Sequence, residues 1–136
     1  MRGFATLFAV LLAAPLLAVA DPASLDPDAT PAGAEASFEA FARDWMAHVQ
    51  ERGERERSNP RLTPGARELV VTYREAGPDF ETQLEATGRP GTPYVGMLHY
   101  TENVYTCSDL HATECHAVSA LPVTEVFRLR DGRWVY

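Results

Sequence analysis

The sequence predicts an α+β fold in which one N-terminal amphipathic helix packs on an antiparallel β-meander of about five strands. Large apolar side chains recur at three- and four-residue spacing between Phe38 and Val49, which indicates a helix with one apolar face. Downstream, segments of alternating polar and apolar residues are separated by turns that contain glycine and proline, as in a meander. A helix with an apolar stripe and a sheet with one face to cover bury those surfaces together.

Residues 1–20 are predicted to be a signal peptide and not part of the fold. Arg2 gives a basic start, residues 4–17 are nearly all apolar, and Ala18-Val19-Ala20 fits the small-x-small cleavage pattern before Asp21. The apolar run is shorter than the ~20 residues of a membrane-spanning helix. We therefore expect no membrane span after signal cleavage, and a periplasmic or secreted protein.

The rest of the chain has the length of one domain, expected over residues 35–136 after a disordered leader at 21–34 that is rich in Asp, Pro and Ala. All 12 basic residues are arginine, which together with many alanines and prolines suggests a GC-rich bacterial genome. The net charge of −7 argues against nucleic acid or an anionic membrane as partner, because the overall field would repel both.

The helix is expected from about Glu35 to Arg57, ending before Asn59-Pro60. Its apolar stripe joins Phe38, Phe41, Trp45, His48 and Val49, with Ala42 and Met46 at the edges of the stripe. Glu39 and Arg43 fall on the opposite side, which predicts a solvated face.

The first predicted strands follow the helix in order. Residues 61–65 are expected to form a loop, and residues 68–75 a strand that ends in a turn at Gly77-Pro78-Asp79. A second strand is expected over residues 80–87, where apolar and polar side chains alternate, and a loop over residues 88–93.

Two long strands are expected on either side of the polar loop between Cys107 and Cys115. If the cysteines face each other, the antiparallel register pairs Val104 with Val118, His99 with Val123, and Val95 with Phe127. Pro122 has no N–H to give to a ladder, so it is expected at a sheet edge or a bulge.

The dipeptide Asp131-Gly132 predicts a tight hairpin, because both residues tolerate positive φ. The hairpin pairs Leu129 with Trp134 and Phe127 with Tyr136 on one face, and leaves Arg128, Arg130 and Arg133 on the other, solvated face.

The element order and the ending from Val126 to Tyr136 (VFRLRDGRWVY) resemble small secreted domains with a cystatin-like roll, and the C-terminal hairpin of nuclear-transport-factor-like domains. The resemblance implies an α+β roll, although the transport-factor-like fold has more helices before its sheet. The Gln-x-Val-x-Gly loop of the cystatin inhibitors is missing, since the loop after Val71 and Tyr73 reads Gly77-Pro78-Asp79. Protease inhibition is therefore not implied.

Cys107 and Cys115 are expected to form a disulfide, because the cysteine count is even and export is predicted. The alternative is a metal site in which both cysteines join His111 and His116, with Glu114 as a further donor to zinc or copper. An oxidising compartment removes the thiolates and favours the disulfide, which would leave His111, Glu114 and His116 as weak donors. No cofactor is predicted.

No nucleophile elbow, phosphate-binding loop or dinucleotide fingerprint occurs in the sequence. The leading hypothesis is a non-enzymatic module that binds a small ligand or an envelope protein in the concavity between helix and sheet. The candidate ligand-binding residues are His99, Tyr100, Trp134 and Tyr73.

Two other classes of function remain open. One is a hydrolase- or isomerase-like enzyme that uses His99 with Glu102 or Glu125 as the carboxylate in the same cleft. The other is a structural or envelope-associated protein that pairs through the face carrying Arg128, Arg130 and Arg133.

Overall fold

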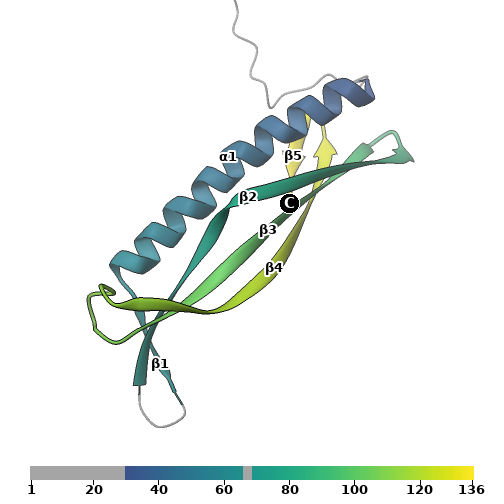
Figure 1. Cartoon of the computed structure of the whole chain (residues 1–136). Helices are drawn as coiled ribbons and strands as arrows, with labels where there is room; N and C mark the ends of the chain where they lie inside the picture. The colour runs from purple at the N-terminus through teal and green to yellow at the C-terminus, as the bar shows by residue number, and fades with distance from the viewer. Residues whose placement is uncertain (1–29, 66–68) are drawn as a thin grey trace, which may run out of the picture.

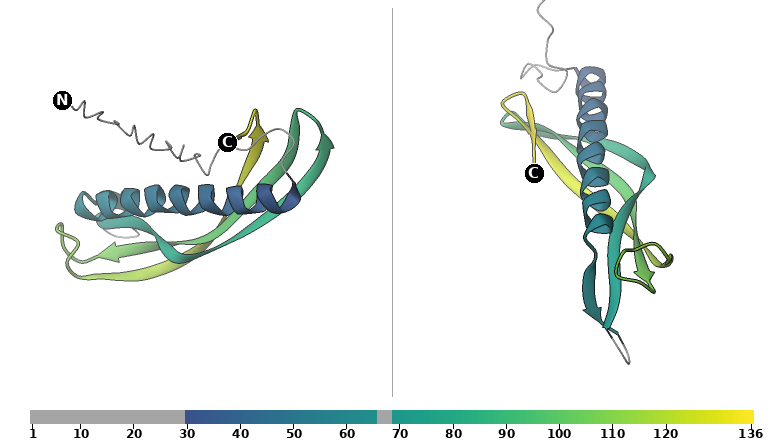
Figure 2. Two further views of the ribbon diagram at one scale, coloured as in Figure 1. Left: turned by 90° about the horizontal axis from the view of Figure 1, so that it is seen from above. Right: turned by 90° about the vertical axis from the view of Figure 1, so that its left-hand side faces the viewer.

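The computed structural model describes residues 30–65 and 69–136, and it confirms one helix on an antiparallel meander. The elements are α1 (Pro31–Ser58), β1 (Arg61–Pro64), β2 (Leu69–Arg89), β3 (Thr92–Cys107), β4 (Cys115–Arg130) and β5 (Arg133–Val135) (Figure 1). The sheet order is β1-β2-β3-β4-β5. Figure 2 shows α1 lying along the inner side of the curved sheet. The predicted signal peptide and residues 21–29 of the predicted leader lie outside the described residues.

The helix begins at Pro31, within the segment predicted as a disordered leader. Thr30 is the N-cap, its hydroxyl accepting from the Gly33 N–H at 3.3 Å, and Pro31 occupies the first turn, where its missing N–H costs nothing. The Thr30-Pro31 pair is therefore a start signal that the low apolar content of the segment concealed. At the other end, Asn59 caps the helix after Ser58.

The buried stripe of α1 is turned relative to the predicted one. Beside the buried Ser37, its buried positions are Ala34, Phe38, Ala42, Met46, Val49 and Gly53, spaced by three and four residues. Phe41 and Trp45 are half-buried, and His48, predicted within the stripe, is exposed beside Glu51. Small side chains decide this orientation: a Cβ on Gly53 would come within 3.2 Å of the Glu75 backbone, so the helix approaches β2 closely along that line.

The first half of the sheet differs from the prediction in two places. The predicted loop after α1 contains β1, which pairs with the beginning of β2. The predicted turn at Gly77-Pro78-Asp79 does not reverse the chain, because β2 continues through it from Leu69 to Arg89. The three residues form a bulge, seen as a register shift between Ala76 and Phe80, and a bulge accommodates glycine and proline without ending a strand.

The register between β3 and β4 also departs from the prediction, by one residue. Cys107 pairs with Cys115 as expected, but a bulge follows Ala117, so Val104 pairs with Ser119, His99 with Thr124, and Val95 with Arg128. The bulge absorbs Val118. Pro122 pairs in register with Thr101 on the outermost part of β4, which confirms the predicted edge position.

The main core lies between α1 and the sheet. Phe38, Met46, Leu98, Phe127 and Leu129 are its largest fully buried side chains. The predicted hairpin is confirmed: Leu129 pairs with Trp134, and the ring of Tyr136 contacts that of Phe127 at 5.5 Å. Arg128, Arg130 and Arg133 are exposed, as predicted.

A smaller cluster lies on the opposite face of the sheet, at the other end. It joins Val71, Tyr73, Cys107 and Ala112, with Tyr105 stacked on Tyr73 at 4.8 Å. Ala112 belongs to the loop between β3 and β4, so this loop covers the cluster where α1 does not reach.

Candidate functional site

The four residues predicted to bind a ligand do not gather at one site. Trp134 is buried in the main core, where its Nε1–H donates to Ser37 Oγ at 3.1 Å. Tyr73 belongs to the cluster under the β3–β4 loop. His99 and Tyr100 are neighbours on β3, so their side chains point to opposite faces of the sheet.

His99 lies on the face that α1 leaves uncovered, between Glu81 on β2 and Thr124 on β4. Its Nδ1 shares a hydrogen bond of 2.8 Å with Thr124 Oγ1. A cavity of about 410 Å³ opens there, lined among others by Asp79, Glu81 and Thr124. The site is open to solvent and joins an imidazole to a hydroxyl across neighbouring strands.

Glu102 and Glu125 lie on the other face of the sheet, which the register of β3 and β4 makes plain. Glu125 pairs with Leu98, and Glu102 is an even number of residues from Leu98, so both share its helix-facing side. The arrangement predicted for an enzyme, His99 beside one of these carboxylates, is therefore not formed. Glu125 lies on the helix-facing side because of the one-residue bulge in β4. The bulge moves the side chain of every later β4 residue to the face opposite the predicted one.

Glu125 instead partners Tyr100 on the helix-facing side. The Tyr100 hydroxyl donates to Glu125 Oε1 at 2.7 Å. Burial of the phenol, followed by this hydrogen bond and the nearby carboxylate charge, raises the pKa of Tyr100. Oε2 of Glu125 is buried without a hydrogen-bond partner among the described residues, as is Nε1 of Trp45.

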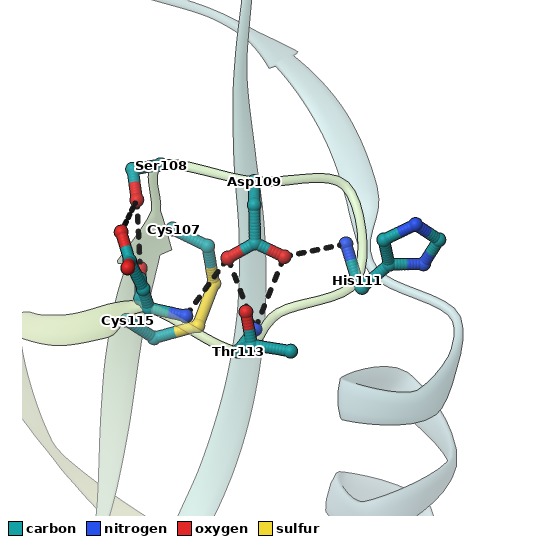
Figure 3. The surroundings of a disulfide bond; sticks show 7 residues. Cys107, Ser108, Asp109, His111, Thr113 and Cys115 are labelled. Carbon is teal, nitrogen blue, oxygen red and sulfur yellow. Dashed lines mark hydrogen bonds between the residues drawn. A yellow bond between two sulfur atoms is a disulfide. The ribbon is translucent and has the colours of Figure 1, made fainter.

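Cys107 and Cys115 form the predicted disulfide, which is compatible with a location outside the cytosol (Figure 3). Asp109 organises the enclosed loop: its carboxylate accepts from the backbone N–H groups of His111 and Glu114, each at 2.8 Å, and of Thr113. These bonds, those to Glu114 and Thr113 first, lower the pKa of Asp109 to about 2.

The alternative metal donors are not arranged around one point. The His111 ring points away from the disulfide in Figure 3, and His116 is exposed at the start of β4. Glu114 Oε2 accepts from Ser108 Oγ at 3.0 Å. Within residues 30–65 and 69–136, no group of three or more His, Cys, Asp or Glu side chains could hold a metal ion.

The predicted concavity between helix and sheet is filled by the main core over most of its length. A hollow of about 540 Å³ remains near the C-terminal end of α1, lined by arginine and glutamate side chains. Arg61 pairs with Glu56, and Arg74 with Glu102, both at 3.5 Å. These pairs are largely exposed on the arginine side, where such contacts contribute about 0–1 kcal/mol.

The outer edge of β4 is the most unusual feature of the surface. β4 pairs with β3 from Cys115 to Arg128, whereas β5 covers only Arg128–Arg130. From Cys115 to Phe127, no strand in the described part of the chain pairs with the other side of β4. The backbone N–H and C=O groups on that side are a template for a further strand.

The side chains of this edge are uncharged and partly apolar. Between His116 and Glu125 the sequence reads AVSALPVT, with no ionisable residue. Val118, Leu121 and Val126 are exposed by 53%, 40% and 40%. None of them was recognised as a functional candidate from sequence, where the signals are the length of this uncharged run and Pro122 within it.

The outer edge of β2 is protected in the usual ways. Beyond its pairing with β1, it carries exposed Asp79, Glu81 and Glu85 and the bulge at Gly77-Pro78. Charges, proline and bulges are the means by which edge strands avoid pairing with other chains. The outer edge of β4 also has a bulge, at Val118, and a proline, Pro122, but it differs from that of β2 in having no charged residue between His116 and Glu125.

No described helix is long and apolar enough to cross a membrane. Comparison with known proteins finds no family model, no curated protein and no solved structure that matches this chain.

Proposed function

We propose that this chain is a non-enzymatic binding module that receives an extended polypeptide segment along the outer edge of β4. The observation that carries the proposal is the unpaired edge from Cys115 to Phe127, which has no ionisable residue between His116 and Glu125. An incoming strand would add to the sheet through main-chain hydrogen bonds, and side chains on alternate positions would give selectivity. With the predicted export, such a segment would belong to an exported or envelope polypeptide.

The position of α1 supports this proposal. The helix packs mainly over β2 and, through its N-terminal half, over Phe127. The views of Figures 1 and 2 agree that the outer side of β4 points away from α1. A strand can therefore approach this edge without displacing the helix or any part of the main core.

The chemistry of the edge selects an extended segment that is apolar on alternate positions. Val126 lies on the uncovered face and Leu121 on the helix-facing side, beyond the reach of α1. A bound strand would bury part of each side chain, and removal of apolar area from water contributes about 25 cal/mol per Å². Pro122 gives no N–H, so it limits the number of bonds that any added strand can make.

The test uses decapeptides selected by panning of a random library on the purified protein. We expect the selected peptides to alternate apolar and polar residues, and to slow amide exchange of residues 117–126 but not of β2. Lysines introduced by Val118→Lys and Val126→Lys should weaken binding by about tenfold or more, since charges block edge pairing.

Leu62→Lys is the matched control, because Leu62 is an exposed apolar residue, 59% accessible, on β1 and away from β4. Peptides that bind the double variant as well as the parent would disprove the proposal. A library that yields no peptide above background, with the protein at a concentration where light scattering shows a monomer, would do the same.

A further inference from the structure

We infer that the strand that fits this edge is β4 of a second copy of the chain, so that two sheets join into one across a two-fold axis. This inference rests on the proposed function, since it names the polypeptide that occupies the edge. Antiparallel pairing of β4 with its own copy would make a continuous sheet from two five-stranded sheets.

The distribution of exposed apolar residues carries the inference. Within residues 30–65 and 69–136, the exposed large hydrophobic residues are Leu62, Leu110, Val118, Leu121, Val126, Val135 and Tyr136. All except Leu62 lie on β4 or at its two ends. Leu110 lies in the loop before β4, and Val135 and Tyr136 lie in and just after β5.

These residues are arranged so that a two-fold axis matches them with one another. Val118 and Val126 lie four residues on either side of Pro122, so an axis near Pro122 sets Val118 of one copy beside Val126 of the other. The same axis brings the loop end of one β4 to the β5 end of the other. Leu110 in the β3–β4 loop and Tyr136, which packs against Phe127 and Trp45, are exposed by 66% and 76% and then lie near the two ends of the joined edge.

Charge explains why the chain would associate along this edge. The chain carries a net charge of −7, so two copies repel each other in most orientations. The run between His116 and Glu125 has no ionisable residue, and the Glu125 carboxylate is bonded to Tyr100 on the helix-facing side. Pairing through β2 would instead set Glu81 and Glu85 of both copies close together.

The experiment measures mass by light scattering over a concentration series of the purified protein. We expect a dimer at about 100 μM, a concentration at which a small interface of micromolar affinity is occupied. Val118→Lys alone and Val126→Glu alone should each weaken dimerisation by about tenfold, because each change occurs twice across the axis. Leu62→Lys should leave the dimer unchanged.

An equimolar mixture of the Val118→Lys and Val126→Glu variants tests the register. The two-fold pairing sets the introduced lysine of one chain beside the introduced glutamate of the other, so the mixture should recover dimers. A parent chain that stays monomeric while selected peptides bind the edge would overturn this inference and leave the proposed function standing. Dimers that neither substitution weakens would place the interface elsewhere and overturn it too. Absence of both dimers and peptide binding would end both proposals.

Discussion

Gly96 lies under the ring of Phe38, and the substitution Gly96→Ala tests how tightly α1 is seated on the sheet. A β-carbon at Gly96 would lie within 2.6 Å of three carbons of that ring. The two nearest ring carbons would lie at 2.4 Å and ordinary contact begins at 3.4 Å, so the ring must move by at least about 1.0 Å (3.4 minus 2.4). Phe38 is 1% exposed and its ring lies 4.7 Å from Trp134, which leaves it little room.

The expected magnitude is a balance of two effects. Alanine loses less chain entropy than glycine on folding, which favours the variant by about 0.4–1 kcal/mol. Overpacking of a filled core costs about 1–3 kcal/mol and occasionally more. Because the Phe38 ring is held by aromatic neighbours, we expect the cost to win, with a net loss of about 2 kcal/mol in the free energy of unfolding. The midpoint of thermal unfolding should fall by about 10 °C.

Thermal and urea unfolding followed by circular dichroism measure this loss, with Gly91→Ala as the matched control. A Cβ at Gly91 meets nothing within 4 Å, so that variant should unfold like the parent. The double variant Gly96→Ala with Phe38→Leu should lose less stability than the sum of the single variants, since the smaller side chain relieves the overlap. An unchanged midpoint for Gly96→Ala would refute the packing of Phe38 against Gly96.

Two further predictions concern the disulfide and the buried phenol. Thiol titration of the native protein should find no free thiol, and the double variant Cys107→Ser with Cys115→Ser should lose about 2.6 kcal/mol of stability by loop-closure entropy; free thiols in the native protein would contradict the bond. The pKa of Tyr100 is raised on folding, so its contribution to stability is complete below pH ~10, the unfolded pKa, and is lost as the pH rises above that value. Absorbance at alkaline pH should therefore show a late tyrosine titration that Tyr100→Phe removes, and an identical titration curve for that variant would contradict the assignment.

The helix and the final hairpin were predictable because their signals are local. Apolar spacing within α1 identifies the helix, and Asp131-Gly132 identifies its turn, in which both residues take positive φ of 48° and 72°. The side of α1 that is buried was less accessible to sequence, because it depends on how closely the backbones approach. The close approach of Gly53 to the Glu75 backbone is a tertiary contact, and the spacing of apolar residues in the helix does not predict it.

The predicted strand boundaries were wrong where pairing within the sheet outweighed the local turn and loop signals of the sequence. Glycine and proline at positions 77–78 have the composition of a turn, yet β3 pairs with β2 on both sides of them and holds the chain straight through a bulge. β1 is short and fully exposed, so it has none of the alternation that indicates a strand. The predicted number of strands agreed with the structure, although two predicted strands are one and a predicted loop is another.

The candidate edge could be predicted only in part. Pro122 in the run AVSALPVT indicates an edge or a bulge, but only the topology reveals that the outer side of the strand is unpaired from Cys115 to Phe127. His99 could be recognised as a polar group on a strand, but the carboxylate on its face could not be assigned, because the bulged residue in β4 moves Glu125 to the opposite face.

The bulge at Val118 follows from two contacts that place the two ends of β4 on opposite faces of the sheet. The disulfide sets Cys115 on the face covered by the β3–β4 loop, and the hairpin sets Leu129 on the face covered by α1. The two residues are an even number of positions apart, so an uninterrupted strand would put both on one face. One extra residue reconciles them, and the chain supplies it at Val118, next to the disulfide. A bulge also increases the local twist of a strand. Val118 therefore allows Cys115 and Leu129 to lie on opposite faces, and it also sets the twist of the unpaired edge to which a partner strand would have to pair.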